Sequence, residues 1–185
     1  MRGSGTKQIS IGELRDEFRK RMADVDSTGA VSLPESLRTA LATASDIQLA
    51  REYLRAATVL HKSTGPSAAL LLNPWFQLIG QSLELAFKAA ITASGAPRPG
   101  GHDLCALCER SEERGIELGD PHARAIVVHV DHIYHKDIYT DEKYAARYGG
   151  SGGGIVPEHE RVGAIVIAVC DQAERFNRLR FDPTL

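Results

Sequence analysis

Residues 67–95, "SAALLLNPWFQLIGQSLELAFKAAITASG", form the most apolar stretch of the chain and decide its fold. Apolar side chains recur there at steps of three and four, the period of one face of an α-helix. The members of this face are Phe76, Ile79, Leu83, Ala86 or Phe87, and Ala90. Pro74 fits either the first helical position after an Asn73 cap or a kink in a longer helix begun near Ser67. Gly95 is typical of a helix C-terminus, so the segment predicts a long, deeply buried helix.

Helix start signals recur before this segment, whereas alternating strand patterns are scarce. A serine followed three positions later by Glu or Gln is a capping box, and it occurs at residues 10–13, 32–35 and 45–48. The third box precedes an amphipathic stripe that should continue to about residue 60. We therefore expect a helix to begin at Ser45.

Two further helices are expected toward the C-terminus. Asp120 and Pro121 fit the N-cap and first helical position of one, and Pro157 opens the last. Residues 149–154, "GGSGGG", fit a flexible linker between them.

Together these patterns predict an all-α, up-and-down helical bundle of about six or seven helices. Residues 1–44 are expected to form an N-terminal helical arm and residues 45–185 the bundle, in one compact domain overall.

The composition describes a globular chain with no overall attraction to nucleic acid. The 185 residues are 43% hydrophobic and carry a formal net charge of −2, so any RNA contact requires a local basic patch. No apolar run approaches the roughly 18 residues of a membrane span, and the start lacks the apolar core of a signal peptide. We therefore expect a cytoplasmic protein with reduced cysteines and no cofactor.

Residues 123–137, "ARAIVVHVDHIYHKD", contain the polar residues of greatest interest. On a helix, one side collects apolar residues, namely Ala123, Ile126, Val127, Val130, Ile133, Tyr134 and Ile138. The opposite side collects Arg124, Val128, His129, His132, His135 and Lys136. The histidines are therefore expected to face solvent or a partner, and the apolar Val128 among them favours a covered surface.

The spacing of Arg124 and His129, with four residues between them, suits a ribonuclease that needs no metal. An arginine can hold a phosphate by bidentate hydrogen bonds, and a histidine can take or give a proton near neutral pH. The two side chains point about 140° apart on a regular helix, so convergence on one substrate requires help, for instance from a two-fold mate.

The order of several motifs resembles the HEPN family (higher eukaryotes and prokaryotes nucleotide-binding). These are "AREYLRAATVL" at 50–60, "GQSLELAFKAAI" at 80–91, "HDLCALC" at 102–108 and "YAARYGG" at 144–150. The resemblance covers roughly residues 46–180 and implies an up-and-down helical bundle that is usually a homodimer.

The resemblance also implies one of two functional branches. One branch is a metal-independent ribonuclease with an Arg/His pair, which Arg124 and His129 match, although Ala125 stands where a small polar residue usually follows the arginine. The other branch binds a ligand or partners a nucleotidyltransferase. Arg147 and Tyr148 favour it, although Gly149 replaces its common proline.

The leading hypothesis is therefore a nucleotide- or RNA-interacting HEPN-like module, as found in bacterial toxin–antitoxin or defence systems. The expected contact residues are His132, His135, Lys136, Arg147 and Tyr148. Expected partners are a second copy of the chain, RNA or a nucleotide, and a nucleotidyltransferase or antitoxin-type protein.

Two alternatives stay open. The first is a metal-independent endoribonuclease that uses Arg124 and His129 across a dimer cleft. The second is a zinc-binding helical protein, whose ligands would be His129, His132 and His135, with Cys105 and Cys108 as further candidates.

Polar residues elsewhere fit ordinary structural roles in helices. Glu84 and Lys88, at i and i+4, are expected to form an ion pair on a helix surface. Asp103 fits a first-turn acid and His102 a cap or loop position.

Overall fold

The computed structural model describes residues 35–63, 68–136 and 157–181, with the side chains of 68–73, 135–136 and 180–181 left out. The described elements are α2 (Glu35–Ser63), α3 (Ala68–Ala93), α4 (Leu104–Glu112), α5 (Ala123–Asp131), the π-helical turn η1 (His132–Lys136) and α8 (His159–Phe181). All are helical and no strand occurs in these ranges, which confirms the predicted all-α bundle. The capping boxes at 10–13 and 32–35 begin outside the described residues.

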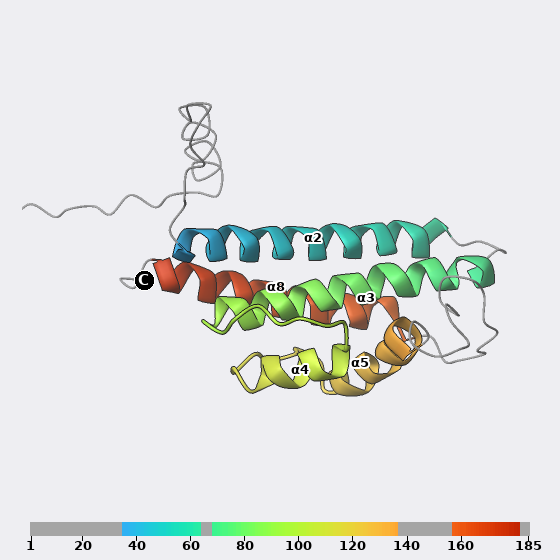
Figure 1. Ribbon diagram of the computed structural model, residues 1–185. Coiled ribbons are helices and arrows are strands. Elements are labelled where there is room, and N and C mark those ends of the chain that lie inside the picture. The colour runs from blue at the N-terminus through green and yellow to red at the C-terminus, as the bar shows by residue number, and fades with distance from the viewer. Residues whose placement is uncertain (1–34, 64–67, 137–156, 182–185) are drawn as a thin grey trace, which may run out of the picture. The chain divides into compact units, whose positions relative to one another are not determined.

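Helix α3 is the central element of the bundle. Phe87, Ala89 and Ala90 have no exposed surface, because α3 and α8 lie between α2 on one side and α4 and α5 on the other (Figure 1). Alanines on several sides of α3 let neighbouring helices approach closely. The helix begins at Ala68 and includes Pro74, so the second of the two predicted starts is the observed one.

The direction of α8 differs from a simple alternation of up and down helices. His159, at the start of α8, contacts both Thr58 near the end of α2 and Trp75 near the start of α3. Helix α8 is therefore antiparallel to α2 but parallel to α3 (Figure 1). The long segment between α3 and α8 allows this, because it returns the chain to the end of the bundle from which α3 starts.

The predicted helix start at Ser45 is not observed, because α2 runs unbroken from Glu35 to Ser63. Asp46 and Ile47, which follow Ser45, are already buried. Extending a helix adds one hydrogen bond per residue, whereas a new start must nucleate again. The expected boundary at residues 44/45 thus falls inside one helix, and residues 39–185 form one compact unit.

The capping predictions downstream are met in part. The carboxylate of Asp103 caps α4 by accepting the backbone N–H of Ala106 at 2.8 Å. Asp120 does not cap α5, which begins at Ala123 after His122. Its carboxylate accepts the His122 N–H at 2.7 Å and pairs with Arg161 of α8, so it fixes the preceding turn instead.

None of the described helices combines the length and apolarity that crossing a membrane requires.

Candidate functional site

A buried polar network surrounds Glu84 in the middle of α3. The carboxylate accepts hydrogen bonds from Lys88 Nζ at 2.7 Å and from the Tyr134 hydroxyl at 2.8 Å. His102 Nδ1 lies 3.0 Å from both carboxylate oxygens. The side chains of Glu84 and Lys88 are each only 6% exposed. The predicted surface ion pair is therefore a buried one, because the other elements cover this face of α3.

The network determines the charge state of Glu84. Burial raises the pKa of this carboxyl, but hydrogen bonds from Lys88, His102 and Tyr134 outweigh that effect and hold the pKa below its usual value. Glu84 is therefore an ionised carboxylate with a donor on each accessible side.

His102 connects this buried charge to the surface, with a side chain that is 51% exposed. An ionised carboxylate only accepts hydrogen bonds, so Nδ1 of His102 carries a hydrogen and Nε2 is the acceptor of the neutral ring. Histidines that a carboxylate orients in this way serve in proteins as proton-transfer groups or as metal ligands. His102 thus has the geometry of a functional histidine.

Tyr134 reaches the network from η1. Its hydroxyl donates to Glu84 and accepts from Gln81 Nε2 at 2.6 Å. The ring occupies the space above Gly80, where an added Cβ would lie 2.2 Å from Tyr134 Cδ2. Short π-helical turns are frequent at functional sites, and this one directs the tyrosine onto α3.

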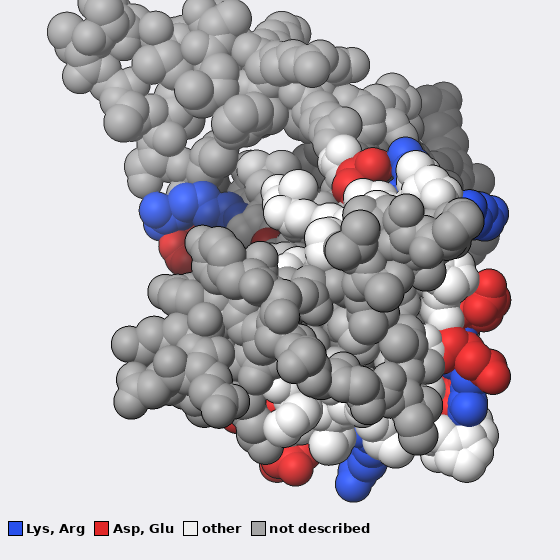
Figure 2. Space-filling model, turned by 90° about the vertical axis from the view of Figure 1, so that its right-hand side faces the viewer, with Lys and Arg blue, Asp and Glu red and all other residues white. Residues whose placement is uncertain are grey.

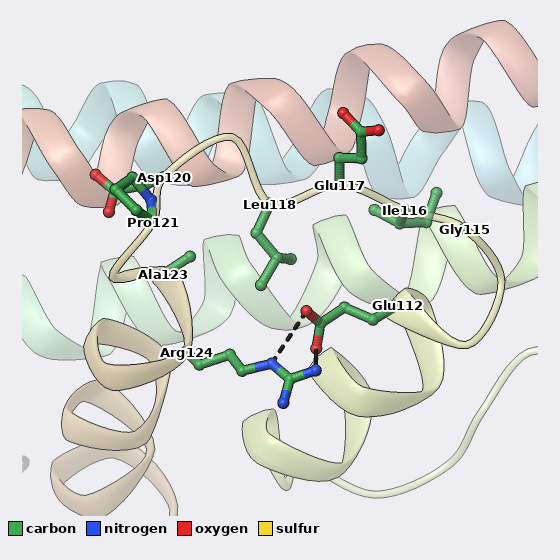
Figure 3. A pocket seen from close by; sticks show the side chains of 9 residues that line it. All are labelled: Glu112, Gly115, Ile116, Glu117, Leu118, Asp120, Pro121, Ala123 and Arg124. Carbon is green, nitrogen blue, oxygen red and sulfur yellow. Dashed lines mark hydrogen bonds and ion pairs between the residues drawn. The ribbon is translucent and has the colours of Figure 1, made fainter.

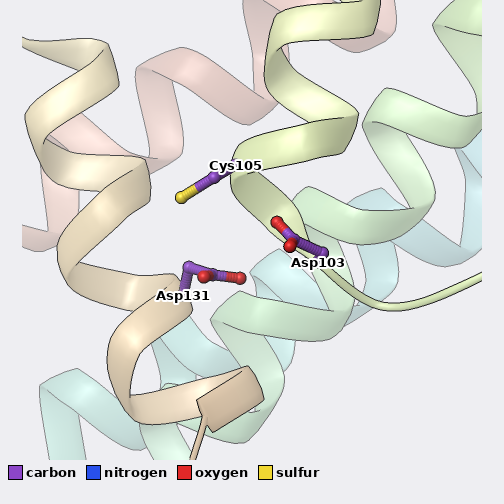
Figure 4. A group of neighbouring side chains, drawn as sticks. All are labelled: Asp103, Cys105 and Asp131. Atoms are coloured by element: carbon purple, nitrogen blue, oxygen red, sulfur yellow. The ribbon is translucent and has the colours of Figure 1, made fainter.

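A second group, formed by Asp103, Cys105 and Asp131, lies where the start of α4 meets the end of α5 (Figure 4). One ligand atom from each residue lies within 4.8 Å of the others. Both carboxylates also have structural roles, because Asp131 accepts the Leu104 N–H at 2.8 Å and Asp103 accepts that of Ala106. Two carboxylate oxygens and a thiolate are a donor set that a divalent cation accepts.

The zinc ligand set expected from the sequence is not assembled in the described residues. Their one group of three or more metal-ligating side chains joins Cys105 to aspartates rather than to histidines. Cys108 is buried with its sulfur 3.8 Å from Glu112, and burial raises the pKa of its thiol to about 12. A thiol that stays protonated is a poor zinc ligand.

Arg124 lies at the rim of a shallow groove with a volume of about 550 Å³. Its guanidinium forms two hydrogen bonds to Glu112 of α4, at 3.1 and 3.0 Å, and its side chain is 73% exposed (Figure 3). Ile116, Leu118 and Ala123 supply apolar lining from the α4–α5 connection and the start of α5.

His129 contacts a different part of the molecule. Its ring packs against Phe76 of α3, with centroids 6.1 Å apart. Its Nε2 is buried and has no hydrogen-bond partner among the described residues. The expectation that His129 faces outward is therefore corrected: the side chain lies at the edge of the α3–α5 contact. Arg124 and His129 meet different helices, so one chain does not bring the pair together.

The other predicted contact residues are placed only in part. Arg124, Val128 and His132 are exposed, which agrees with the predicted outer face of α5. The backbones of His135 and Lys136 belong to η1, but their side chains lie outside the described part. Arg147 and Tyr148 lie outside the described residues altogether.

The sequence contains one signal of the Glu84 network, the position of Glu84 and Lys88 within the most apolar segment of the chain. An ionisable pair in the most apolar segment is unlike the solvated pair of a helix surface, because buried charges require partners. The contributions of His102 and Tyr134, which are 18 and 50 residues from Glu84, gave no such signal.

No family model matches this chain, and neither a curated protein nor a solved structure is significantly similar to it.

Proposed function

We propose that this chain is a HEPN-like module that binds a nucleotide or RNA, and that Arg124 and His129 do not act as a catalytic pair within one chain. The supporting observation is that the guanidinium of Arg124 is exposed at the rim of a groove, whereas the ring of His129 packs against Phe76. The motifs that resemble the family and the all-α bundle that it implies also support the proposal.

The groove suggests how such a ligand is held. Its volume lies in the range of small-molecule sites, which is about 300–1,000 Å³. Arg124 already presents a bidentate fork to Glu112, and a phosphate offers the same geometry to a guanidinium. The ligand phosphate has to replace the Glu112 carboxylate, so we expect weak binding that falls as salt is added.

The lining of the groove contains three carboxylates, Glu112, Glu117 and Asp120, and one cation, Arg124, so an anion is attracted there at a single point. On the face shown in Figure 2, the described Lys and Arg side chains are interspersed with Asp and Glu. Such a surface favours a short ligand held by a few groups over a long nucleic acid held along a basic stripe.

The test is binding of labelled nucleotides and short single-stranded RNAs to the full chain, measured by fluorescence anisotropy with EDTA present. Arg124→Ala should weaken binding about tenfold or more, because it removes a charge-assisted bidentate contact. Arg55→Ala is the matched control, since Arg55 is 74% exposed and also pairs with a glutamate. Absence of binding by the wild type, or equal losses in both variants, would contradict the proposal.

The same samples test the alternative, a metal-independent endoribonuclease formed across a homodimer. RNA cleavage that persists in EDTA and disappears in both Arg124→Ala and His129→Ala would establish it in place of the binding module. We also propose, from the family resemblance, a homodimer and a nucleotidyltransferase or antitoxin-type partner in a bacterial toxin–antitoxin or defence system. Light scattering of the purified chain tests the dimer.

A further inference from the structure

Four side chains meet where the end of α2, the start of α3 and the start of α8 come together; we call Thr58, His61, Trp75 and His159 the His159 cluster. His159 is buried. Its Nδ1 lies 3.2 Å from the indole Nε1 of Trp75, and its Nε2 lies 2.8 Å from the hydroxyl of Thr58. One imidazole thus joins three helices.

The hydrogen bonds allow only one protonation state of His159. An indole N–H is a donor only, so Nδ1 of His159 has to be an unprotonated acceptor. The Thr58 hydroxyl donates its hydrogen to the Leu54 carbonyl at 2.8 Å, so its oxygen accepts from Nε2–H of His159. The neutral Nε2–H tautomer satisfies both contacts, whereas a protonated ring directs a second N–H at the Trp75 N–H.

The charged groups around His159 oppose protonation on balance. From α2, the ring of His61 stacks on His159 with centroids 4.9 Å apart, and Lys62 follows it. Glu158 and Glu160 flank His159 in sequence, and Glu160 favours its charged form. Burial is the largest effect and lowers the pKa of His159, with a further lowering from His61 and Lys62 and a partial offset from Glu160. The N-terminal end of a helix also disfavours a cation.

We propose that His159 is an acid-sensitive switch: in its neutral form it fastens the start of α8 to α2 and α3, and its protonation releases that end of α8. Protonation removes the Trp75 contact and leaves two buried N–H groups facing one another.

A series of ring contacts connects the His159 cluster to α5. Trp75 packs edge-on against Phe76, with centroids 5.0 Å apart, and Phe76 contacts the ring of His129. A movement of Trp75 therefore changes the packing of the helix that carries Arg124 and His129. The switch itself depends only on the His159 cluster and not on the proposed function.

The experiment uses the full chain and its single tryptophan, which is Trp75. Tryptophan fluorescence and the indole N–H resonance are followed from pH 8 to pH 5. We expect one transition with a midpoint below about 6.5, the ordinary value for histidine. His159→Gln should abolish it, because an amide does not titrate. His132→Gln, which changes an exposed histidine of η1, should leave it in place.

The variant His61→Gln distinguishes the contribution of His159 from that of the histidine stacked on it. If His159 titrates, the transition persists in this variant with a higher midpoint, because one repulsive neighbour is removed. A transition that persists in His159→Gln, or that vanishes in His61→Gln, would overturn the proposal. Should circular dichroism show that His159→Gln is unfolded at pH 7.5, the wild-type indole resonance decides. A resonance unchanged between pH 8 and pH 5 would refute the switch.

Discussion

Glu84 and Lys88 form an ion pair of 2.7 Å inside the most apolar helix of the chain, with both side chains almost fully removed from water. Desolvating two charges costs several kcal/mol per ion, and the attraction between them repays this only when the remaining hydrogen bonds are made. His102 and Tyr134 supply those bonds to Glu84. The pair therefore requires the loop before α4 and the turn η1 to be in place.

Removing the negative member of this pair should destabilise the fold strongly. We expect Glu84→Gln to lower the free energy of unfolding by about 3–5 kcal/mol, because it leaves the Lys88 ammonium buried without a counter-charge. Urea denaturation followed by circular dichroism measures the change. Glu52→Gln removes a more exposed partner of Arg55 and should cost less than about 1 kcal/mol. The double variant Glu84→Met/Lys88→Met should be more stable than Glu84→Gln; a double variant less stable than that single one would contradict this account.

The free energy of unfolding should fall with acid in the pH range in which Glu84 becomes protonated. Its pKa is lower in the folded chain than in the unfolded chain, so the unfolded state binds more protons as the pH falls. The contribution of Glu84 is complete above its ordinary pKa of 4.5 and is lost as the pH falls from there through the folded value. Urea denaturation at a series of pH values between 3 and 7 tests this. Glu84→Gln should flatten the curve below pH 4.5, and an unchanged slope in that variant would assign the loss to other groups.

Two helical glycines should respond oppositely to alanine. At Gly80 an added Cβ would lie 2.2 Å from the Tyr134 ring, so Gly80→Ala should cost about 1–3 kcal/mol through displacement of the tyrosine. At Gly163 the nearest atom is Leu54 Cδ1 at 3.7 Å, an ordinary contact. Gly163→Ala should therefore stabilise the chain by about 0.5–1 kcal/mol, because alanine has a higher helix propensity than glycine and lowers the conformational entropy of the unfolded chain. Thermal denaturation of both variants measures the difference, and equal signs would show that Tyr134 does not occupy this space.

The three cysteines should differ in reactivity in the native chain. Burial raises the pKa of Cys108 and of Cys170 to about 12, which leaves about one thiol in ten thousand ionised at pH 8. Cys105 is partly exposed. We expect an alkylating reagent to modify Cys105 first, as read by mass spectrometry of the intact chain and its peptides. Labelling of Cys170 before Cys105 would show that the core around α8 opens readily, and urea-unfolded protein gives the reference for full labelling.

Local periodicity was enough to predict the class of the fold and the buried face of α3. The spacing of Phe76, Ile79, Leu83 and Ala90 fixes which side of that helix avoids water, because the turn of an α-helix is the same in every context. The same rule correctly predicted that Val127 and Val130 of α5 are buried, whereas Arg124 and Val128 are exposed.

Tertiary packing determined the features that local rules do not address. Helical periodicity gives the direction in which the His129 side chain leaves α5. How much of its ring is covered depends on the approach of Phe76 from α3. The capping box at Ser45 gave no helix start because the preceding residues were already helical. Glu84, His102 and Tyr134 meet across 18 and 50 residues of chain. Such contacts depend on how the helices pack, which the pattern along any one segment does not contain.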